Sequence, residues 1–383
     1  PQVIVIGAGI VGICTALMLQ RAGRQVLLVD RNAPGHETSF GNAGLFSTPL
    51  VVPLNNPGLW QQLPNILLRK NNYLRFEWSY LLRNATTLAG LLMHATRNSY
   101  QARARVLRQL IQTSDVLHRQ WVAEAGVEEN LRDHGALEFY PSEALFEATH
   151  KDRARLKSQG VKFEILDETG ISSVEPLLLP GLHRAMWLHD AWSLESPLAL
   201  SEAYFALFTD SGGNFLQQQV ERLDPLTGEE GWRLSMADGS SEQAAEVVVC
   251  TGPWSRQFLQ PLGIRIPMIF EHGAHRIIEP GPSGLLTRPV VDLEGGYLIT
   301  PMQGKYRLTC GIYLAQQEAR YDWSQLDACE AMARQRLQLG DTLPEQDWHG
   351  IRPSMPDYLP VIGETAQKGL WLNSGQGSLG LTT

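Results

Sequence analysis

The sequence predicts an α/β protein in which a domain with a parallel sheet is interleaved with an α+β domain built on a mainly antiparallel sheet. A buried strand, a glycine-rich turn and a helix follow one another within residues 3–21. A second apolar strand follows at 25–29, another of the same kind appears much later at 246–250, and a related loop follows near the C-terminus. Shorter strand patterns with hairpin turns fill the segments between them.

Composition narrows the class of protein. At roughly 150 residues per domain, 383 residues indicate two domains, and 43% hydrophobic with 19% charged residues excludes a disordered chain. A net charge of −8 argues against a nucleic-acid partner. The cysteines are far apart, without a CxxC pair, which disfavours a metal cluster or a disulfide scaffold and indicates a reducing, cytoplasmic setting: Cys14, Cys250, Cys310 and Cys329.

The first segment carries the strongest motif. The strand 3–6 runs into Gly7-Ala8-Gly9-Ile10-Val11-Gly12, a helix follows to Arg21, and Gly23 ends it. A second strand, 25–29, ends in Asp30. No secretory leader is expected because the chain opens on a strand, and no run reaches the 18 to 20 apolar residues of a spanning helix.

Each position in this motif has a physical role. Gly7 permits the tight turn, Gly9 lets a pyrophosphate approach the backbone, and Gly12 lets the helix pack close to the strand. The helix N-terminus offers N–H groups and a positive dipole end to the phosphates. Asp30 can accept hydrogen bonds from a ribose diol, which disfavours NADP and leaves FAD and NAD open.

Three further loops favour FAD. Residues 37–44 form a polar, glycine-rich loop where an NAD dehydrogenase would normally have a helix, and the strand 246–250 runs into Thr251-Gly252-Pro253-Trp254. A third loop spans 373–380. One ligand touched by three distant loops suits the long FAD molecule better than NAD. The expected cofactor contacts are Gly7, Gly9, Ile10, Val11, Gly12, Asp30, Arg31, Ser39, Asn42, Ala43, Gly44, Val220, Thr251, Gly252, Trp254, Gly375, Gly377, Ser378, Leu379, Gly380 and Thr382.

The remaining pattern divides the chain. Residues 1–50, 193–262 and 345–383 are assigned to a discontinuous, Rossmann-type FAD-binding domain, and 51–192 and 263–344 to a substrate domain. A helix is expected over 99–125, its apolar face formed by Val106, Leu110, Leu117 and Trp121. A hairpin is expected around 302–304, and a helix over 325–339.

The motifs GAGIVG, SFGNAG, VVVCTGPWS, GIRPSMPDYLPVIG and GQGSLGLT, with Asp30 in register, resemble those of the D-amino-acid oxidase superfamily of flavoproteins. The match is closest to its D-amino-acid dehydrogenase branch. The resemblance implies non-covalent FAD and a D-amino-acid substrate oxidised by hydride transfer from Cα to flavin N5. It also implies a quinone-type or other electron acceptor, and a further helix beyond Thr383.

The family resemblance and the chemistry of carboxylate binding together indicate candidate catalytic residues. Arg352, in Gly-Ile-Arg-Pro, is the candidate clamp for the substrate carboxylate, because a guanidinium can make two parallel hydrogen bonds to it; Arg276 and Arg307 are the next candidates. Tyr297 corresponds to a substrate-contacting tyrosine of the related oxidases. His275 is nominated as a pocket residue, although an ordinary strand histidine fits the pattern as well. No metal site is expected.

Residues 60–114 are unusually basic for an acidic chain. They hold eight basic residues against Glu77 alone, and tryptophan and tyrosine are interleaved. This suits a bilayer interface, as does the implied position of the resembled dehydrogenases on the inner face of the cell membrane. A solvated helical face remains the alternative. The functional alternatives are an oxygen-using oxidase of glycine, sarcosine or a proline-type imino acid, the flavin subunit of a larger complex, and an NAD dehydrogenase.

Overall fold

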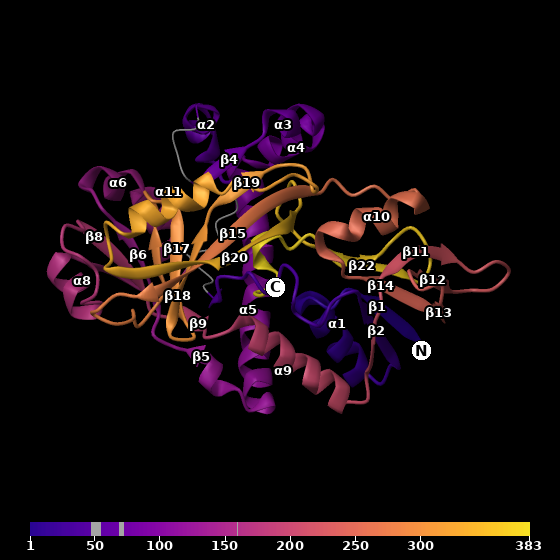
Figure 1. The fold of residues 1–383 in the computed structure, drawn as a ribbon. Coiled ribbons are helices and arrows are strands. Elements are labelled where there is room, and N and C mark those ends of the chain that lie inside the picture. Colours follow the sequence, from indigo (N-terminus) through magenta and orange to yellow (C-terminus); the bar gives the residue numbers. More distant parts are fainter. Residues whose placement is uncertain (47–54, 69–72, 159) are drawn as a thin grey trace.

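The computed structural model describes residues 1–46, 55–68, 73–158 and 160–383. Two large sheets dominate it (Figure 1). The first has the strand order β10-β2-β1-β14-β22-β21 and is parallel except for the last strand. Its strands come from distant parts of the chain: β1 (Val3–Ile6), β2 (Val26–Asp30), β10 (Asn214–Gln217), β14 (Glu246–Val249), β21 (Val361–Glu364) and β22 (Leu370–Ser374).

Both faces of this sheet are covered. On one face α1 (Ile10–Arg21) and α9 (Pro197–Asp210) pack their apolar side chains, such as Ile13 and Phe208, against the strands. On the other lies a three-stranded sheet, β11 (Val220–Pro225), β12 (Trp232–Met236) and β13 (Ser241–Ala244), with Trp232 and Leu234 in the core. Strands buried on both faces read as continuous apolar runs, which is why β1 and β14 stand out in the sequence.

The second sheet is mainly antiparallel, with the order β4-β19-β15-β18-β17-β16-β6-β8-β7 and β20 paired to β15. Its strands are β4 (Leu74–Phe76), β6 (Ala136–Tyr140), β7 (Phe163–Leu166), β8 (Arg184–Leu188), β15 (Ile269–Pro280), β16 (Val290–Asp292), β17 (Tyr297–Met302), β18 (Lys305–Cys310), β19 (Ile312–Leu314) and β20 (Leu339–Ser354). A small sheet, β3 (Leu45–Phe46), β9 (Trp192–Leu194) and β5 (Leu131–Arg132), lies between the two. The predicted fold class is confirmed, whereas the domain boundaries remain predictions.

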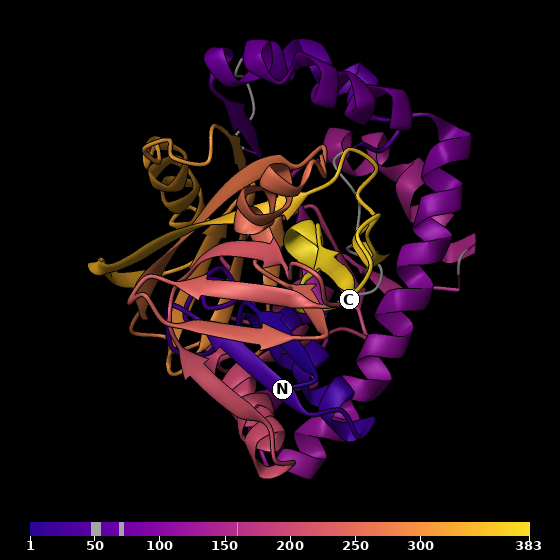
Figure 2. The ribbon, with the colours of Figure 1, turned by 90° about the vertical axis from the view of Figure 1, so that its right-hand side faces the viewer.

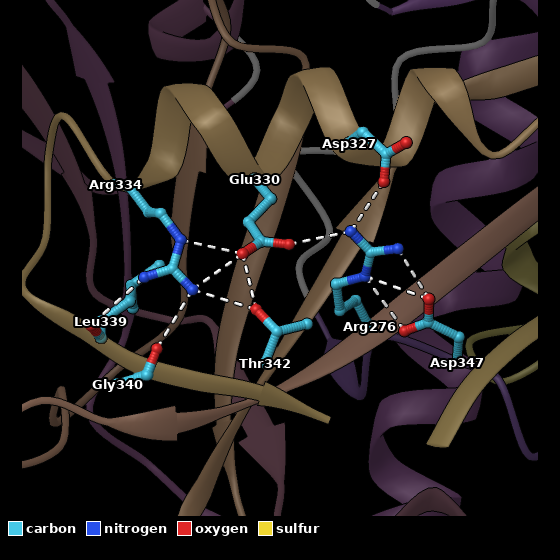
Figure 3. A network of polar contacts seen from close by, with 8 residues as sticks. All are labelled: Arg276, Asp327, Glu330, Arg334, Leu339, Gly340, Thr342 and Asp347. Carbon is cyan, nitrogen blue, oxygen red and sulfur yellow. Dashed lines mark hydrogen bonds and ion pairs between the residues drawn. The ribbon is translucent and has the colours of Figure 1, made fainter. Parts of the chain in front are cut away.

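Helix α11 (Ser324–Ala333) covers the outer face of the second sheet. Arg276 of β15 donates to Asp327 and Glu330 of α11 and to Asp347 of β20 (Figure 3). Next to it, Arg334 donates to Glu330 and to the carbonyls of Leu339 and Gly340. The carboxylates hold the pKa of Arg276 above its ordinary value, Asp347 most strongly, although partial burial opposes them. Arg276 is thereby committed to the outer face, so it is no candidate for the substrate clamp.

The remaining helices lie at the periphery. They are α2 (Leu59–Leu67), α3 (Trp78–Arg83), α4 (Ala85–His94), α5 (Arg97–Ala125), α6 (Glu143–Ala148), α7 (His150–Ser158), α8 (Glu168–Val174) and α10 (Ser255–Leu259), with 3-10 turns at Glu128–Asn130, Gly252–Trp254, Gln260–Leu262 and Gly377–Leu379. Figure 2 shows α5 running along one side of the molecule, beginning beside α2–α4.

Two local expectations need correction. The helix expected over 325–339 ends at Ala333, and residue 339 already begins β20. The buried stripe of α5 runs through Tyr100, Leu107, Ile111 and Trp121, whereas Val106 is 43% exposed. Apolar periodicity misplaced the stripe because buried polar side chains, Arg103 and His118, occupy two of its positions.

Candidate active site

The glycine-rich turn after β1 has room for backbone only. A Cβ at Gly12 would lie 1.8 Å from the carbonyl oxygen of Gly7, and one at Gly7, whose φ is +104°, would lie 2.5 Å from that of Cys250. Gly9 faces Ser39, whose Oγ would be 3.2 Å from an added Cβ. The turn therefore brings bare backbone and the start of α1 to an open cavity, which suits a pyrophosphate.

Asp30 lies at the carboxyl end of β2, beside this turn. One carboxylate oxygen accepts the N–H of Ala8 at 2.6 Å and the other accepts the N–H of Asn32 at 2.9 Å. The carboxylate thus fixes the turn and still lines the cavity, where it can accept from a ribose diol. Next to it, the Arg31 guanidinium lies 4.4 Å from the Trp254 ring centroid, tying β2 to the Thr251–Trp254 turn.

The loop 37–44 is tied to both domains. Ser39 Oγ accepts the N–H of Ile10 at 2.9 Å, which joins the loop to the start of α1. From the second sheet, Arg307 donates to the carbonyls of Phe40 and Asn42, at 2.9 and 2.8 Å, and Thr300 donates to that of Ala43 at 3.0 Å. The loop therefore forms the wall between the phosphate turn and the second sheet.

The third loop follows β22 and packs on the first. Asn373 donates to Thr15 of α1 at 3.0 Å, and Gly380 lies against Val11. The segment Gly377–Leu379 is a single 3-10 turn. Gly375 has φ +90° and packs against Met355, so it shapes the turn.

These three loops enclose one continuous cavity of about 970 Å³ that extends over the second sheet. All the predicted cofactor residues line it except Gly12, Gly44 and Gly375. Those three act through the backbone: Gly12 permits helix packing, and Gly44 (φ +64°) and Gly375 permit turns. The glycines leave space that larger side chains would occupy, and this space fits FAD. The pyrophosphate would lie at residues 7–12 and a ribose at Asp30.

One face of the second sheet forms the floor of the cavity beyond these loops. Because side chains alternate along a strand, Trp348, Gly350 and Arg352 of β20 share this face, and all three line the cavity. Leu298 of β17 pairs with Thr309 of β18 on the same face. The sequence signal for Trp348 was its even spacing from Arg352.

Arg352 is held above glycines. A Cβ at Gly273 would lie 2.5 Å from the Arg352 guanidinium, and the guanidinium donates to the Gly311 carbonyl at 3.3 Å. Among the described residues no carboxylate forms an ion pair with it. Glu271, its cross-strand partner, instead accepts from the Tyr358 hydroxyl, and burial raises the pKa of Glu271. Arg352 therefore presents to the cavity a guanidinium fork that no carboxylate in the described part of the chain neutralises.

Tyr297 borders the cavity, but its side chain packs elsewhere. It pairs with Cys310 and belongs to the core between β17 and α11, with Tyr321 and Cys329. Its hydroxyl is buried, and burial, followed by the neighbouring Asp292 carboxyl, raises its pKa. The arrangement gives no support to the predicted hydrogen bond from Tyr297 to a substrate carboxylate.

His275 lies on the cavity side of β15, yet it is not among the described residues that line the cavity. Its ring stacks on Trp348 at 5.3 Å, and Nδ1 lies 3.4 Å from the Gly41 carbonyl. Burial, with a smaller contribution from Arg307, lowers its pKa to about 3. His275 is therefore a neutral support for the loop and Trp348, and this placement gives no support to a catalytic role.

The depressed pKa of His275 predicts a loss of stability in acid. Between pH 6.5 and 3 the unfolded chain binds a proton at this residue and the folded protein does not, so stability falls as pH falls. We expect His275→Gln to remove roughly 2 kcal/mol of the decline between pH 7 and 5. Chemical unfolding at the two pH values measures this, with exposed His36→Gln as the control; an equal decline in all three proteins would contradict it.

No sequence motif predicted that residues of β6 and α7 reach the far end of the cavity. Glu138, Tyr140 and Arg153 line that end, where Tyr140 donates to Glu138 at 2.5 Å and Arg153 lies over the Phe146 ring. Burial raises the pKa of Glu138. No group of histidine, cysteine or acidic residues among the described residues could hold a metal ion.

A three-loop dinucleotide cradle that opens onto a sheet face bearing a guanidinium is typical of dinucleotide-dependent oxidoreductases. The DAO family model, described as FAD dependent oxidoreductase, matches residues 2–383. The chain belongs to this family of FAD-dependent oxidoreductases.

Individual relatives agree with this assignment. A D-amino-acid oxidase from Bradyrhizobium diazoefficiens is 29% identical over 393 residues, covering 99% of this chain and 91% of that protein. The crystal structure of glycine oxidase from Geobacillus kaustophilus superposes with a TM-score of 0.73 at 17% identity, covering 100% of this chain and 90% of that chain. L-proline dehydrogenase from P. horikoshii gives 0.72 at 16%, covering 100% and 89%. The two structures establish the shared fold.

Proposed function

We propose that this enzyme oxidises the C–N bond of a D-amino acid, giving an imino acid that hydrolyses to a keto acid. The observation that carries the proposal is Arg352, a cavity-lining guanidinium without a carboxylate partner among the described residues. The match to a D-amino-acid oxidase supports an amino-acid substrate. The names of the two superposed structures keep glycine or a proline-type imino acid as alternatives.

The residues of this chain position the substrate in the proposed reaction. Arg352 binds the carboxylate through two N–H donors, which fixes the orientation of Cα. Bare Gly273 leaves the space that the guanidinium occupies, and Leu298 and Thr309 form the floor next to it. Bound FAD supplies the acceptor for the hydride. We propose that FAD is held without a covalent bond. Burial raises the pKa of the Cys250 thiol to about 12, which disfavours attack by this cysteine on the cofactor.

A substrate panel tests the proposal. The holoenzyme is mixed with D- and L-amino acids, glycine, sarcosine and proline, with a quinone analogue as acceptor, under air and under nitrogen. Turnover of D-amino acids under nitrogen supports a dehydrogenase. Peroxide formation under air without the quinone favours the oxidase, and turnover only with a co-purified chain favours a subunit of a complex. Activity confined to L-amino acids would overturn the proposal.

We further propose that the helices α2, α3 and α4 rest on a membrane that carries the electron acceptor, on its cytoplasmic side. These helices lie together at one end of the molecule (Figure 1). Large apolar side chains are exposed there, with Leu82 and Met93 about three-quarters exposed and Trp60 and Trp78 about half exposed. Exposed Arg83 and Arg97 add positive charge. Apolar and cationic side chains on one surface suit an anionic bilayer.

In the structure, fewer basic side chains of residues 60–114 are available to a membrane than the sequence suggested. Arg103 is buried and donates to the carbonyls of His94 and Asp357, so it contributes to packing and not to the surface. Arg69 and Lys70 lie outside the described residues. None of the described helices is long and apolar enough to cross a bilayer.

Vesicle binding tests this surface. We expect the protein to sediment with vesicles containing phosphatidylglycerol, and less so in high salt, because exposed charges are screened over about 8 Å at physiological ionic strength. Leu82→Ser with Met93→Ser should reduce binding at least about 100-fold, since burying each apolar side chain contributes about 1.5 to 3 kcal/mol and the two contributions add. Val116→Ser, on the exposed side of α5, is the control. Equal sedimentation of both variants would contradict the assignment.

A further inference from the structure

Arg307 is a buried cation without a counterion. It lies on β18, is only 7% exposed, and has no carboxylate partner among the described residues. Burial lowers its pKa to about 10, which still leaves it charged at neutral pH. Its Nε has no hydrogen-bond partner, and one terminal nitrogen donates to both Phe40 and Asn42 carbonyls. A charge buried in this way is costly unless something nearby stabilises it.

The direction of these two carbonyls fixes the direction of the N–H group in the same peptide unit. In a trans peptide the C=O and N–H are antiparallel, so carbonyls facing Arg307 turn the N–H groups of Gly41 and Ala43 away from it. Gly41 and Ala43 both line the cavity, and neither N–H donates to any group in the described part of the chain. The loop therefore presents two free donors to the cavity, with the Arg307 charge directly behind them.

This wall lines the place where a bound cofactor ring would have to lie in order to reach the substrate site. On one side Ser39 meets the start of α1, next to the pyrophosphate turn. On the other, Gly41 packs on Trp348, so closely that a Cβ would lie 1.7 Å from its ring, and Trp348 shares a strand face with Arg352. Gly41–Ala43 thus separate the phosphate site from the substrate site. The ring of FAD must span that interval to meet the substrate.

We propose that Arg307 is a positioning residue that aims the Gly41 and Ala43 N–H groups at the FAD ring and stabilises the negative charge which the ring gains on reduction. The cation polarises both peptide units, which makes each N–H a stronger donor. No proton or electron passes through Arg307. The inference rests on FAD occupying this cavity, and not on which amino acid is oxidised.

The measurement is the two-electron midpoint potential of bound FAD, titrated with dithionite against a reference dye. Arg307→Met removes the charge and both hydrogen bonds, and Arg307→Lys keeps the charge. Thr300→Val removes the neighbouring bond to the Ala43 carbonyl and serves as the matched loop control. We expect Arg307→Met to weaken binding of reduced FAD about tenfold more than that of oxidised FAD. This ratio lowers the potential by about 30 mV.

We expect Arg307→Lys to retain most of the potential, and Thr300→Val to retain all of it even where FAD binds less tightly. An unchanged potential in Arg307→Met overturns the proposal, and so does an equal fall in Arg307→Lys. Loss of FAD from both Arg307 variants at an unchanged unfolding temperature would make Arg307 a structural anchor only, which also overturns it. Dithionite needs no amino-acid substrate, so failure of the proposed function would leave this result interpretable.

Discussion

Arg352→Lys is expected to lower the rate of flavin reduction far more than a conservative change of charge suggests. Lysine supplies a point charge, whereas the substrate carboxylate needs a planar fork to fix its rotation. Losing one charge-assisted hydrogen bond costs about 1.5 to 3 kcal/mol, or roughly 10- to 150-fold in efficiency. Misalignment of Cα with the cofactor adds to this loss. FAD content should not change, because Arg352 lies beyond the loops that hold the cofactor.

The measurement is anaerobic flavin reduction at saturating D-amino acid, together with the dissociation constant of a simple carboxylate competitor. Arg265→Lys, at an exposed site, is the control for the substitution itself. If Arg352→Lys matches the unmutated enzyme in both quantities, Arg352 is not the carboxylate clamp. Arg276 is then no replacement, because its guanidinium is bound on the outer face of the sheet (Figure 3).

Asp30→Ala is expected to release FAD. The substitution removes the acceptors for a ribose diol and also the bond from the Ala8 N–H, so the phosphate turn loses its anchor. Each hydrogen bond to a charged group contributes about 1.5 to 3 kcal/mol, which predicts a dissociation constant at least 10-fold higher. Flavin absorbance retained through dilution and gel filtration measures the effect.

Two comparisons make this result specific. Asp30→Asn keeps one carbonyl oxygen for Ala8 and should lose less FAD than Asp30→Ala. Asp224→Ala, at the end of β11, removes a carboxylate that pairs with Arg222 on the surface, and should leave FAD content unchanged. An Asp30→Ala protein that stays fully yellow through dilution would show that Asp30 does not hold the ribose.

The nucleotide half of the candidate site can be predicted from the sequence alone. Gly7, Gly9 and Gly12 can be assigned from sequence because their roles depend on the absence of a side chain, and Asp30 because it ends a buried strand at a fixed distance from the turn. The residues predicted to contact the cofactor come from distant segments, and most of them line one cavity. Where the local backbone requires a particular residue type, such as glycine, that requirement can be recognised in the sequence.

The substrate half of the site depends on tertiary contacts that the sequence does not reveal. Alternation places Tyr297 and Leu298 on opposite faces of β17, but the sequence does not say which face α11 covers. The same holds for Arg276 and His275, which lie on opposite faces of β15. Arg307 illustrates the limit most clearly, since its partners are carbonyls more than 260 residues away. Any residue supplies a backbone carbonyl, so no residue type marks such a contact in advance.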